Sequence, residues 1–330
     1  MKLLITGGAG FVASHLVPRL SACADNELVL LDNFNDYYCP ETKWQQVRPL
    51  LETPNVTLEE GDFSDFDYCR KLFAKHRPTH LIHLGAYPGV PLSVESPEIY
   101  VKNNIAGTTA LLEAARHNPV ERFLFASSST VYGVGARAPF VEDAPLGIPA
   151  SPYGVTKRAA ELMGLTYHKL HGVPFTALRL FNVYGPRIRS DLALSIFTRT
   201  IMAHEPIQLY GDGTIRRDFT HADDICVGIV AALTASNVSG ECINLGHNEP
   251  IEIRSLIDMI AHAVGTEAVI EQRAPRAGDM PLTCADLTKA GRLLNYEPRV
   301  PIERGVNEYV EWARAKHPEL VEGRLLTSTG

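Results

Sequence analysis

Short apolar runs alternate with stretches of helical spacing over the first 130 residues. Helical periodicity follows the first run and returns over residues 103–118. The runs have the length and composition of buried strands and cover residues 2–6, 27–32, 56–62, 79–85 and 122–129. Strands that alternate with helices in this way predict an α/β fold, with a parallel, doubly wound sheet between two layers of helices.

The pattern becomes less regular in the second half of the chain. A helix is expected to begin near Tyr153, and residues 175–186 are expected to form a further strand. Helices and loops then mix, although residues 241–246 have the apolar character of a late buried strand. We therefore predict a first domain over residues 1–185, which the late strand can rejoin, and a smaller mixed α/β lobe over residues 186–330.

A glycine-rich turn lies between the first predicted strand and the first predicted helix. In the segment TGGAGFVAS, Gly7 and Gly10 take two glycine positions of a dinucleotide-binding fingerprint, and Ala13 takes the third. The first glycine permits a tight turn, the second lets the backbone approach a pyrophosphate, and a small third residue suffices for helix packing. The N-terminus of the following helix favours the anion.

Two carboxylates end predicted strands in the same half of the chain. Asp32 follows the glycine turn by roughly the 20 residues that a ribose-binding carboxylate requires. A carboxylate there would repel a 2′-phosphate, so we expect NAD rather than NADP. Asp62 is a candidate acceptor from the adenine amino group. The alternatives are structural: a plain glycine turn, a strand-capping Asp32 and a solvated Asp62.

Tyr153 and Lys157 lie four residues apart in the segment SPYGVTK and so share one face of a predicted helix. A free phenol ionises only near pH ~10. The ammonium group of Lys157 and an oxidised nicotinamide ring would both favour the phenolate, which would make Tyr153 a proton acceptor. The alternative is a pair of ordinary helix residues.

Hydroxyl side chains end the fifth predicted strand, at Ser127, Ser128, Ser129 and Thr130. The carboxyl ends of parallel strands border the ligand crevice of a doubly wound sheet. One of these hydroxyls can therefore orient a substrate hydroxyl toward Tyr153. The alternative is that the hydroxyls only cap a turn.

Composition excludes several classes of protein. The net charge is −7 and no basic run occurs, which argues against nucleic-acid binding. The six cysteines are scattered and none has zinc-ligand spacing, so we predict no metal site. No apolar stretch approaches the roughly 20 residues of a membrane span. We expect a cytoplasmic protein, because scattered thiols are typical of a reducing compartment.

The segments GGAGFVASHL, HLGA, SSSTVYG, YGVTK, FNVYGP and RRDF together resemble the extended short-chain dehydrogenase/reductase family, in particular its nucleotide-sugar 4-epimerases. The resemblance covers nearly the whole chain. It implies a Rossmann domain that binds NAD, a C-terminal lobe that binds a UDP-sugar, and catalysis by Ser128, Tyr153 and Lys157. It also suggests a homodimer formed by the helices around 103–117 and 153–170, whose alanine-rich faces could pack closely.

The same resemblance assigns further residues to each ligand. For NAD they are Gly7, Gly10, Phe11, Val12, Asp32, Asn33, Asp62, Phe63, Leu84, Gly85, Ala86, Asn103, Tyr153 and Lys157. For the UDP-sugar they are Gly89, Ser127, Ser128, Ser129, Thr130, Asn182, Arg189, Gln208, Tyr210, Arg217, Arg276 and Asp279. Within the second set, Arg217 and Arg276 are expected to clamp the diphosphate, since guanidinium groups suit phosphate oxygens.

The absence of carboxylates that related enzymes carry indicates which reaction to expect. Dehydratases of this family carry an Asp-Glu pair where this chain has Ser129 and Thr130, and the related uronate decarboxylases carry a glutamate at the second position. No obvious group then remains for proton abstraction at C5 of the sugar. We therefore expect inversion at C4 by hydride transfer through a 4-keto sugar. A net-redox reductase and a non-catalytic NAD-sensing module are the alternatives.

Two segments, LDNFNDYYCPETK and GPRIRSDLALSIFTRTI, are most similar to the UDP-glucuronate 4-epimerase subgroup. Arg189 matches an arginine of that subgroup and is expected near the C5 carboxylate. The subgroup usually has threonine in place of Asn182 and arginine in place of Pro91. We expect conversion of UDP-glucuronate to UDP-galacturonate, with UDP-glucose/UDP-galactose or an N-acetyl sugar as the alternative.

Overall fold

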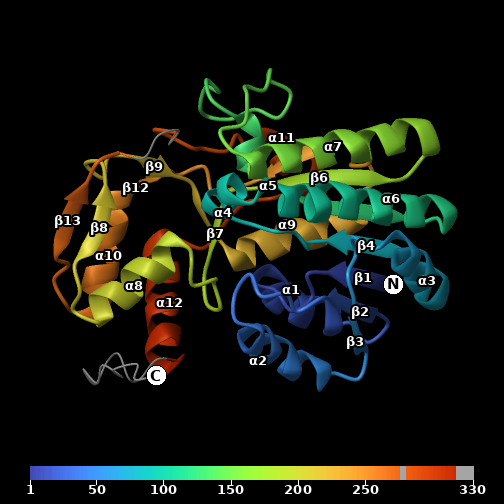
Figure 1. Ribbon diagram of the computed structural model, residues 1–330, viewed down its shortest axis with the longest axis horizontal. Helices are drawn as coiled ribbons and strands as arrows, with labels where there is room; N and C mark the ends of the chain where they lie inside the picture. The colour runs from blue at the N-terminus through green and yellow to red at the C-terminus, as the bar shows by residue number, and fades with distance from the viewer. Residues whose placement is uncertain (276–279, 317–330) are drawn as a thin grey trace.

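The computed structural model describes residues 1–275 and 280–316, and Figure 1 shows a large sheet between helices beside a smaller lobe. Seven parallel strands form the sheet in the order β11-β6-β5-β4-β1-β2-β3. They are β1 (Lys2–Thr6), β2 (Glu27–Asp32), β3 (Val56–Glu60), β4 (His80–His83), β5 (Arg122–Ser128), β6 (Phe175–Leu180) and β11 (Cys242–Leu245). The predicted doubly wound α/β fold is confirmed, and the strand order reverses between β1 and β4.

Helices cover both faces of the sheet because its strands are apolar on both sides. In β1, Leu3 and Ile5 belong to one hydrophobic core, while Leu4 belongs to another. The first core contains α1 (Phe11–Ser21), α2 (Pro40–Leu51), α9 (Ala222–Thr234) and α11 (Thr288–Leu294). The second contains α3 (Phe66–His76), α6 (Gly107–His117) and α7 (Pro152–His171).

The smaller lobe consists of short strand pairs and three helices around a core of its own. The pairs are β7 (Asn182–Tyr184) with β10 (Phe219–His221), β8 (Ile207–Tyr210) with β13 (Ile270–Arg273), and β9 (Arg216–Arg217) with β12 (Ile251–Glu252). The helices are α8 (Ala193–Met202), α10 (Ile253–Val264) and α12 (Ile302–Lys316). Phe11, at the start of α1, also packs in this core, so the lobe rests against the glycine-rich turn.

Two predicted elements are divided in the structure. The strand expected over 175–186 leaves the large sheet after Leu180, and Asn182–Tyr184 pairs instead with β10 of the lobe. Phe181 separates the two parts because its ring is buried in a separate aromatic cluster with Tyr132 and Phe140. The helix expected over 103–118 begins as a π-helix, η1 (Val101–Ala106), and continues as α6.

Short helices surround the N-terminal end of α7. They are α4 (Val90–Glu95), α5 (Pro97–Tyr100) and the 3₁₀ helix η2 (Ser129–Tyr132), and each packs against α7. The late strand expected over 241–246 is β11, which pairs with β6 at the edge of the large sheet. Within the described ranges, no helix combines the length and apolar character that crossing a membrane requires.

Candidate active site

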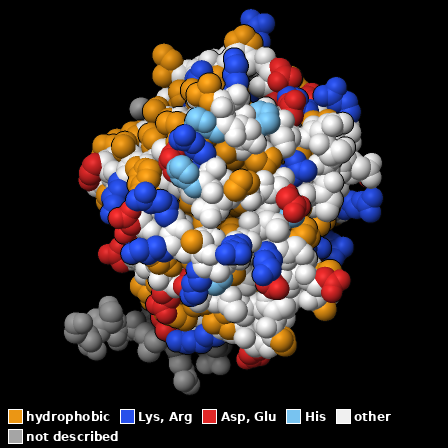
Figure 2. Space-filling view, turned by 90° about the vertical axis from the view of Figure 1, so that its right-hand side faces the viewer, with side chains coloured by type: hydrophobic (Ala, Val, Ile, Leu, Met, Phe, Trp, Pro, Cys, Tyr) orange, Lys and Arg blue, Asp and Glu red, His pale blue; other side chains and the backbone are white. Residues whose placement is uncertain are grey.

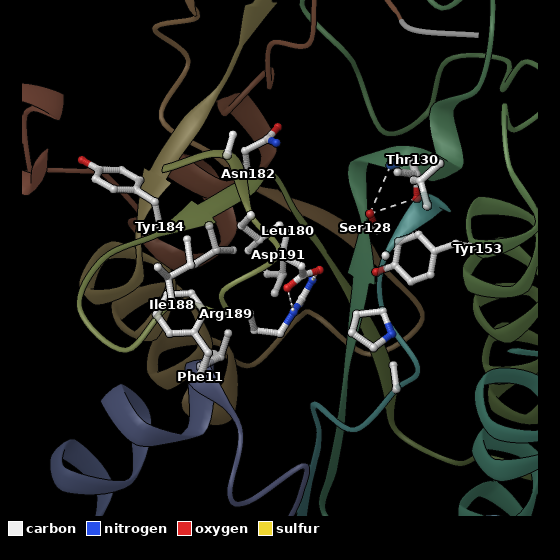
Figure 3. A pocket seen from close by; sticks show the side chains of 18 of the residues that line it. Phe11, Ser128, Thr130, Tyr153, Leu180, Asn182, Tyr184, Ile188, Arg189 and Asp191 are labelled. Carbon is white, nitrogen blue, oxygen red and sulfur yellow. Dashed lines mark hydrogen bonds and ion pairs between the residues drawn. The ribbon is translucent and has the colours of Figure 1, made fainter. Parts of the chain in front are cut away.

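A cavity of about 950 Å³ lies where the carboxyl ends of the sheet strands meet the smaller lobe. Segments that follow β1, β4, β5 and β6 line one side, and strands β7, β8 and β9 line the other. Figure 3 shows side chains from both parts of the molecule pointing into this space. The cavity is therefore at the point where the strand order reverses, which is where ligands of doubly wound sheets bind.

Most of the residues predicted for the site line this cavity. Among the described candidates, Asp62 does not line the cavity, and its Oδ1 accepts a hydrogen bond from the Ser64 N–H at 2.8 Å within its own loop. Arg276 and Asp279 lie outside the described residues. The predicted residues that do line the cavity are Gly7, Gly10, Phe11, Val12, Asp32, Asn33, Phe63, Leu84, Gly85, Ala86, Gly89, Asn103, Ser127, Ser128, Ser129, Thr130, Tyr153, Lys157, Asn182, Arg189, Gln208, Tyr210 and Arg217.

The glycine-rich turn leaves room for a ligand at the N-terminus of α1. Gly7 has a φ of +67°, and a Cβ at this position would lie 2.8 Å from the backbone nitrogen of Gly85. A side chain would therefore be both strained and obstructed. Gly10 is the N-cap residue of α1 and brings no capping side chain, so the positive end of the helix can face an anion.

Asp32 connects β2 to this turn. Its Oδ2 accepts from the Ala9 N–H at 3.1 Å, and its Oδ1 accepts from the Phe34 N–H at 2.9 Å. Each carboxylate oxygen can accept a second hydrogen bond. Because Asp32 also lines the cavity, it can hold the turn in place and still accept from a ribose hydroxyl.

Ser128 and Tyr153 lie next to each other on one wall of the cavity, and the hydroxyl of Tyr153 points toward Ser128 (Figure 3). The Oγ of Ser128 accepts from both Thr130 Oγ1 at 2.9 Å and the Thr130 N–H at 3.2 Å. Burial raises the pKa of Tyr153, while the charge of Arg189 and a hydrogen bond with Ser128 lower it, and the net shift is upward. The sequence predicted that Lys157 and an oxidised nicotinamide ring would together lower this pKa. Burial of the ring outweighs the lowering effects, and the cation that acts on Tyr153 is Arg189.

Lys157 follows Tyr153 by one turn of α7 and is fully buried. Its Nζ donates to the carbonyl oxygen of Ala126 on β5 at 2.8 Å and lies 4.8 Å from the centroid of the Phe125 ring. Burial lowers the pKa of Lys157 to about 7, although the charge of Glu161 opposes this. This lysine can therefore change its charge near neutral pH.

Arg189 is paired with Asp191 inside the cavity. Its Nε donates to Oδ1 and its Nη2 donates to Oδ2, both at 2.9 Å, and Tyr37 Oη also donates to Oδ2 at 3.1 Å. Burial lowers the pKa of Arg189, but Asp191 outweighs burial and raises it overall. Burial raises the pKa of Asp191, but Arg189 outweighs burial and lowers it overall. Both side chains therefore keep their charges in the cavity.

The lobe contributes polar side chains on the other side. Gln208 and Tyr210 alternate with buried residues along β8 and so point to the same side. Arg217 on β9 donates to the carbonyl oxygen of Met280 at 2.6 Å and lines the cavity with them. One buried hydroxyl, Ser127 Oγ, has no hydrogen-bond partner within the described residues, which suits a position that a bound molecule completes.

Carboxylates are rare in the cavity. Among the described lining residues only Asp32 and Asp191 carry one, and both accept hydrogen bonds from the protein. Ser129 and Thr130, which also line the cavity, carry no carboxylate. Sequence reasoning missed Tyr37 and Asp191, although both lie in segments that resembled the UDP-glucuronate subgroup.

A dinucleotide-type glycine turn, a tyrosine and lysine on one helix, and hydroxyl groups at the end of β5 define an extended short-chain dehydrogenase/reductase. The sequence matches the NAD dependent epimerase/dehydratase family over residues 3–246. The chain belongs to this family.

Relatives with known names are similar over almost the whole chain. UDP-glucuronate 4-epimerase 4 of Arabidopsis thaliana is 38% identical, with 94% of this chain and 75% of that protein aligned. UDP-glucuronate 4-epimerase of Thermodesulfobacterium geofontis is 37% identical, with 94% and 95% aligned. The crystal structure of UDP-glucuronic acid 4-epimerase from Bacillus cereus, in complex with UDP-glucuronic acid and NAD, superimposes with a TM-score of 0.91. It has 35% identity, and 96% of this chain and 100% of that chain are covered.

The lowered pKa of Lys157 predicts how stability depends on pH. Between about pH 7 and 10, the unfolded chain holds a proton on this lysine that the folded chain has lost. Stability from this group therefore rises with pH through that window and is constant below it. We expect the free energy of unfolding of wild type, relative to Lys157→Met, to improve by roughly 2 kcal/mol from pH 7 to pH 9.

Denaturant titrations of both proteins at equal NAD content measure this difference. Lys169→Met, which changes an exposed lysine on the same helix, is the control and should show no such pH dependence. An equal difference between wild type and Lys157→Met at both pH values would contradict the burial argument.

Proposed function

We propose that the protein is an NAD-dependent UDP-glucuronate 4-epimerase, which interconverts UDP-glucuronate and UDP-galacturonate. The observation that carries the proposal is the meeting of three groups in one cavity: Tyr153, Ser128 and the cation of Arg189. The first two suit proton transfer at a sugar hydroxyl, and the third suits a sugar carboxylate. Relatives named as UDP-glucuronate 4-epimerases support the same substrate.

The cavity fits NAD on the side of the large sheet. The turn at Gly7 admits backbone only, the N-terminus of α1 faces the space for a pyrophosphate, and Asp32 keeps acceptor capacity for a ribose. Bound NAD supplies the acceptor for a hydride and a positive charge near the reacting centre. Asp62 has no role in this proposal, because its side chain caps its own loop.

Tyr153 takes the proton of the 4-hydroxyl while the hydride leaves C4. Ser128 contacts Tyr153 and orients the hydroxyl, and it also favours the ionised phenol together with Arg189. The 4-keto sugar then turns within the cavity, and Tyr153 returns the proton as the same hydride adds to the other face of C4. A positioned acid–base group of this kind contributes about 10²–10⁴-fold to rate.

The smaller lobe holds the UDP-sugar in this proposal, although α9, β11 and α11 within the predicted span 186–330 belong to the large sheet and its core. Arg217 clamps the diphosphate, and Gln208 and Tyr210 on β8 border the uracil. Arg276 and Asp279 keep their predicted roles as substrate contacts, outside the described residues. Asn182 and the hydroxyl of Ser127 line the part of the cavity that is assigned to the sugar in this proposal, and Arg189 contacts the carboxylate at C5.

A neutral UDP-hexose is the second candidate substrate. Two observations favour it: Arg189 already has a carboxylate partner in Asp191, and position 182 holds the asparagine that resembles hexose epimerases. A UDP-glucose 4-epimerase from Thermotoga maritima, in a crystal structure with UDP-glucose, matches at 29% identity and a TM-score of 0.86.

The cytoplasmic location expected from the sequence stays a prediction.

Incubation with UDP-glucuronate and no added cofactor tests the reaction. Because the hydride returns to the sugar in every cycle, we expect UDP-galacturonate to appear by ¹H NMR with NAD carried by the purified protein. Tyr153→Phe should lower kcat by about 10²–10⁴-fold, since it removes the proton acceptor. Tyr167→Phe, on the same helix as Tyr153, loses only a hydrogen bond to Glu113 of α6 and is the control. Turnover that consumes NADH stoichiometrically would contradict an epimerase and indicate a reductase.

We propose that the protein is a homodimer through the outer side of α7. The alanines expected at the interface, such as Ala114 and Ala160, are buried inside the chain. Exposed apolar residues remain at Val101, Val155 and Leu162, on η1 and α7, which pack against each other. The end view in Figure 2 shows hydrophobic side chains gathered in its upper half, at the height of α6 and α7 in Figure 1. Exposed apolar side chains that gather on one face of a protein can mark an interaction site.

Light scattering coupled to gel filtration measures the assembly. We expect wild type at twice the mass of one chain and Leu162→Glu at the mass of one chain, since a buried charge would oppose association. Val269→Glu, at an exposed position in the smaller lobe, is the matched control and should remain dimeric. A wild type that elutes as a monomer at micromolar concentration would refute the proposed dimer.

A further inference from the structure

The cation proposed to meet the sugar carboxylate is already neutralised by the protein. Asp191 engages Arg189 through two parallel hydrogen bonds of 2.9 Å, the strongest geometry available to this pair. Both oxygens of Asp191 are used. On the arginine, the Nη1 group makes no hydrogen bond within the described residues, so it remains able to donate to a ligand. Figure 3 shows the pair on one side of the cavity, with Tyr153 and Ser128 on the other.

Three loops fix the carboxylate of Asp191 in place. Tyr37, from the loop after β2, donates to its Oδ2 at 3.1 Å. Gly89, from the loop after β4, has a φ of +89°, and a Cβ there would lie 2.3 Å from Tyr37 Oη. The tyrosine hydroxyl is therefore packed against the backbone of the second loop. Burial raises the pKa of Tyr37 to about 12, so its hydroxyl stays a donor to Asp191 at ordinary pH.

We propose that Asp191 is a specificity-determining residue, which sets how strongly the cavity prefers a uronate over a neutral hexose. The inference rests on the proposed function and concerns the same site. The side chain of Arg189 is 18% exposed, and a guanidinium in such a position without a partner would favour an anionic ligand over a neutral one. A guanidinium that is already paired with a carboxylate neither favours an anionic ligand as strongly nor penalises a neutral one. Asp191 also places a negative charge near the position of the incoming carboxylate, which weakens uronate binding.

The consequence is a cavity that tolerates both substrate classes. A uronate gains the Nη1 edge of Arg189 but meets the charge of Asp191. A hexose leaves the pair undisturbed. Arg189 also acts on Tyr153, but that effect is common to both substrates. Because the contact to the substrate is made away from C4, the difference between the two substrates falls on binding.

Substitution of Asp191 by asparagine tests the proposal, because it keeps the shape and removes the charge. Dissociation constants for UDP-glucuronate and UDP-glucose are measured by calorimetry on the NAD-bound enzyme, and kcat and KM are measured for both. We expect the Asp191→Asn variant to raise the ratio of affinities in favour of the uronate by about 10-fold or more. The change in the ratio should appear in KM, and any change in kcat that Arg189 transmits to Tyr153 should be similar for the two substrates. Arg189→Gln should shift the ratio the other way.

Tyr37→Phe is the matched control, since it removes a hydrogen bond to Asp191 but neither charge, and its ratio should stay within about threefold of wild type. Since the ratio compares two ligands on one protein, partial unfolding of a variant cancels. A ratio unchanged or lowered in Asp191→Asn would overturn the proposal. If wild type binds both sugars but epimerises neither, the proposed function is contradicted. The role of Asp191 is still decided by the ratio of affinities.

Discussion

The hydrogen bond from Lys157 Nζ to the carbonyl oxygen of Ala126 joins α7 to β5 at the reactive end of the fold. The lysine is fully buried, so its ammonium group needs this acceptor. The helix approaches the sheet very closely: a Cβ on Gly164 would lie 2.2 Å from the ring of Phe175. This contact brings Tyr153, one turn before the lysine, beside Ser128 at the end of β5. The position of the reactive pair is thus a property of helix–sheet packing.

Charged side chains are few among the described lining residues, and these are hydrogen-bonded to the protein. Lys43 donates to the backbone oxygen of Asn35 at 2.7 Å and to its side-chain oxygen at 2.9 Å, and Asp32 holds the glycine turn. Arg189 differs because it acts on two neighbours: it pairs with Asp191, and it lowers the pKa of Tyr153 against burial. In the proposed function, the residue that meets the substrate carboxylate therefore also assists ionisation of the general base. Substrate selection and proton transfer are coupled through one guanidinium.

The fold and the NAD side of the site could be predicted from the sequence because the patterns that indicate them are local. The turn at Gly7, the carboxylate of Asp32 and the spacing of Tyr153 and Lys157 each depend on a few neighbouring residues. The contacts that could not be predicted are long-range. Tyr37 and Asp191 are 154 residues apart, and their hydrogen bond exists only because the lobe docks on the sheet.

The same limit explains two other differences from the sequence predictions. The direction of the pKa of Tyr153 depends on how deeply its ring is buried and on Arg189, and neither is visible in the spacing of one helix. The break in the predicted strand after Leu180 depends on the packing of Phe181 against Tyr132 and Phe140. These residues lie more than 40 positions away along the chain.

The central claim is that Tyr153 and the cofactor act on C4 of the sugar, and that no proton is removed from C5. The most direct test follows the hydrogen atoms of the substrate. UDP-glucuronate labelled with deuterium at C4 is epimerised in ordinary water, and the product is analysed by NMR and mass spectrometry. The account predicts full retention of deuterium at C4 of UDP-galacturonate, and no deuterium at C5 when unlabelled substrate reacts in D₂O. Loss of the C4 label to solvent, or solvent deuterium at C5, would contradict it.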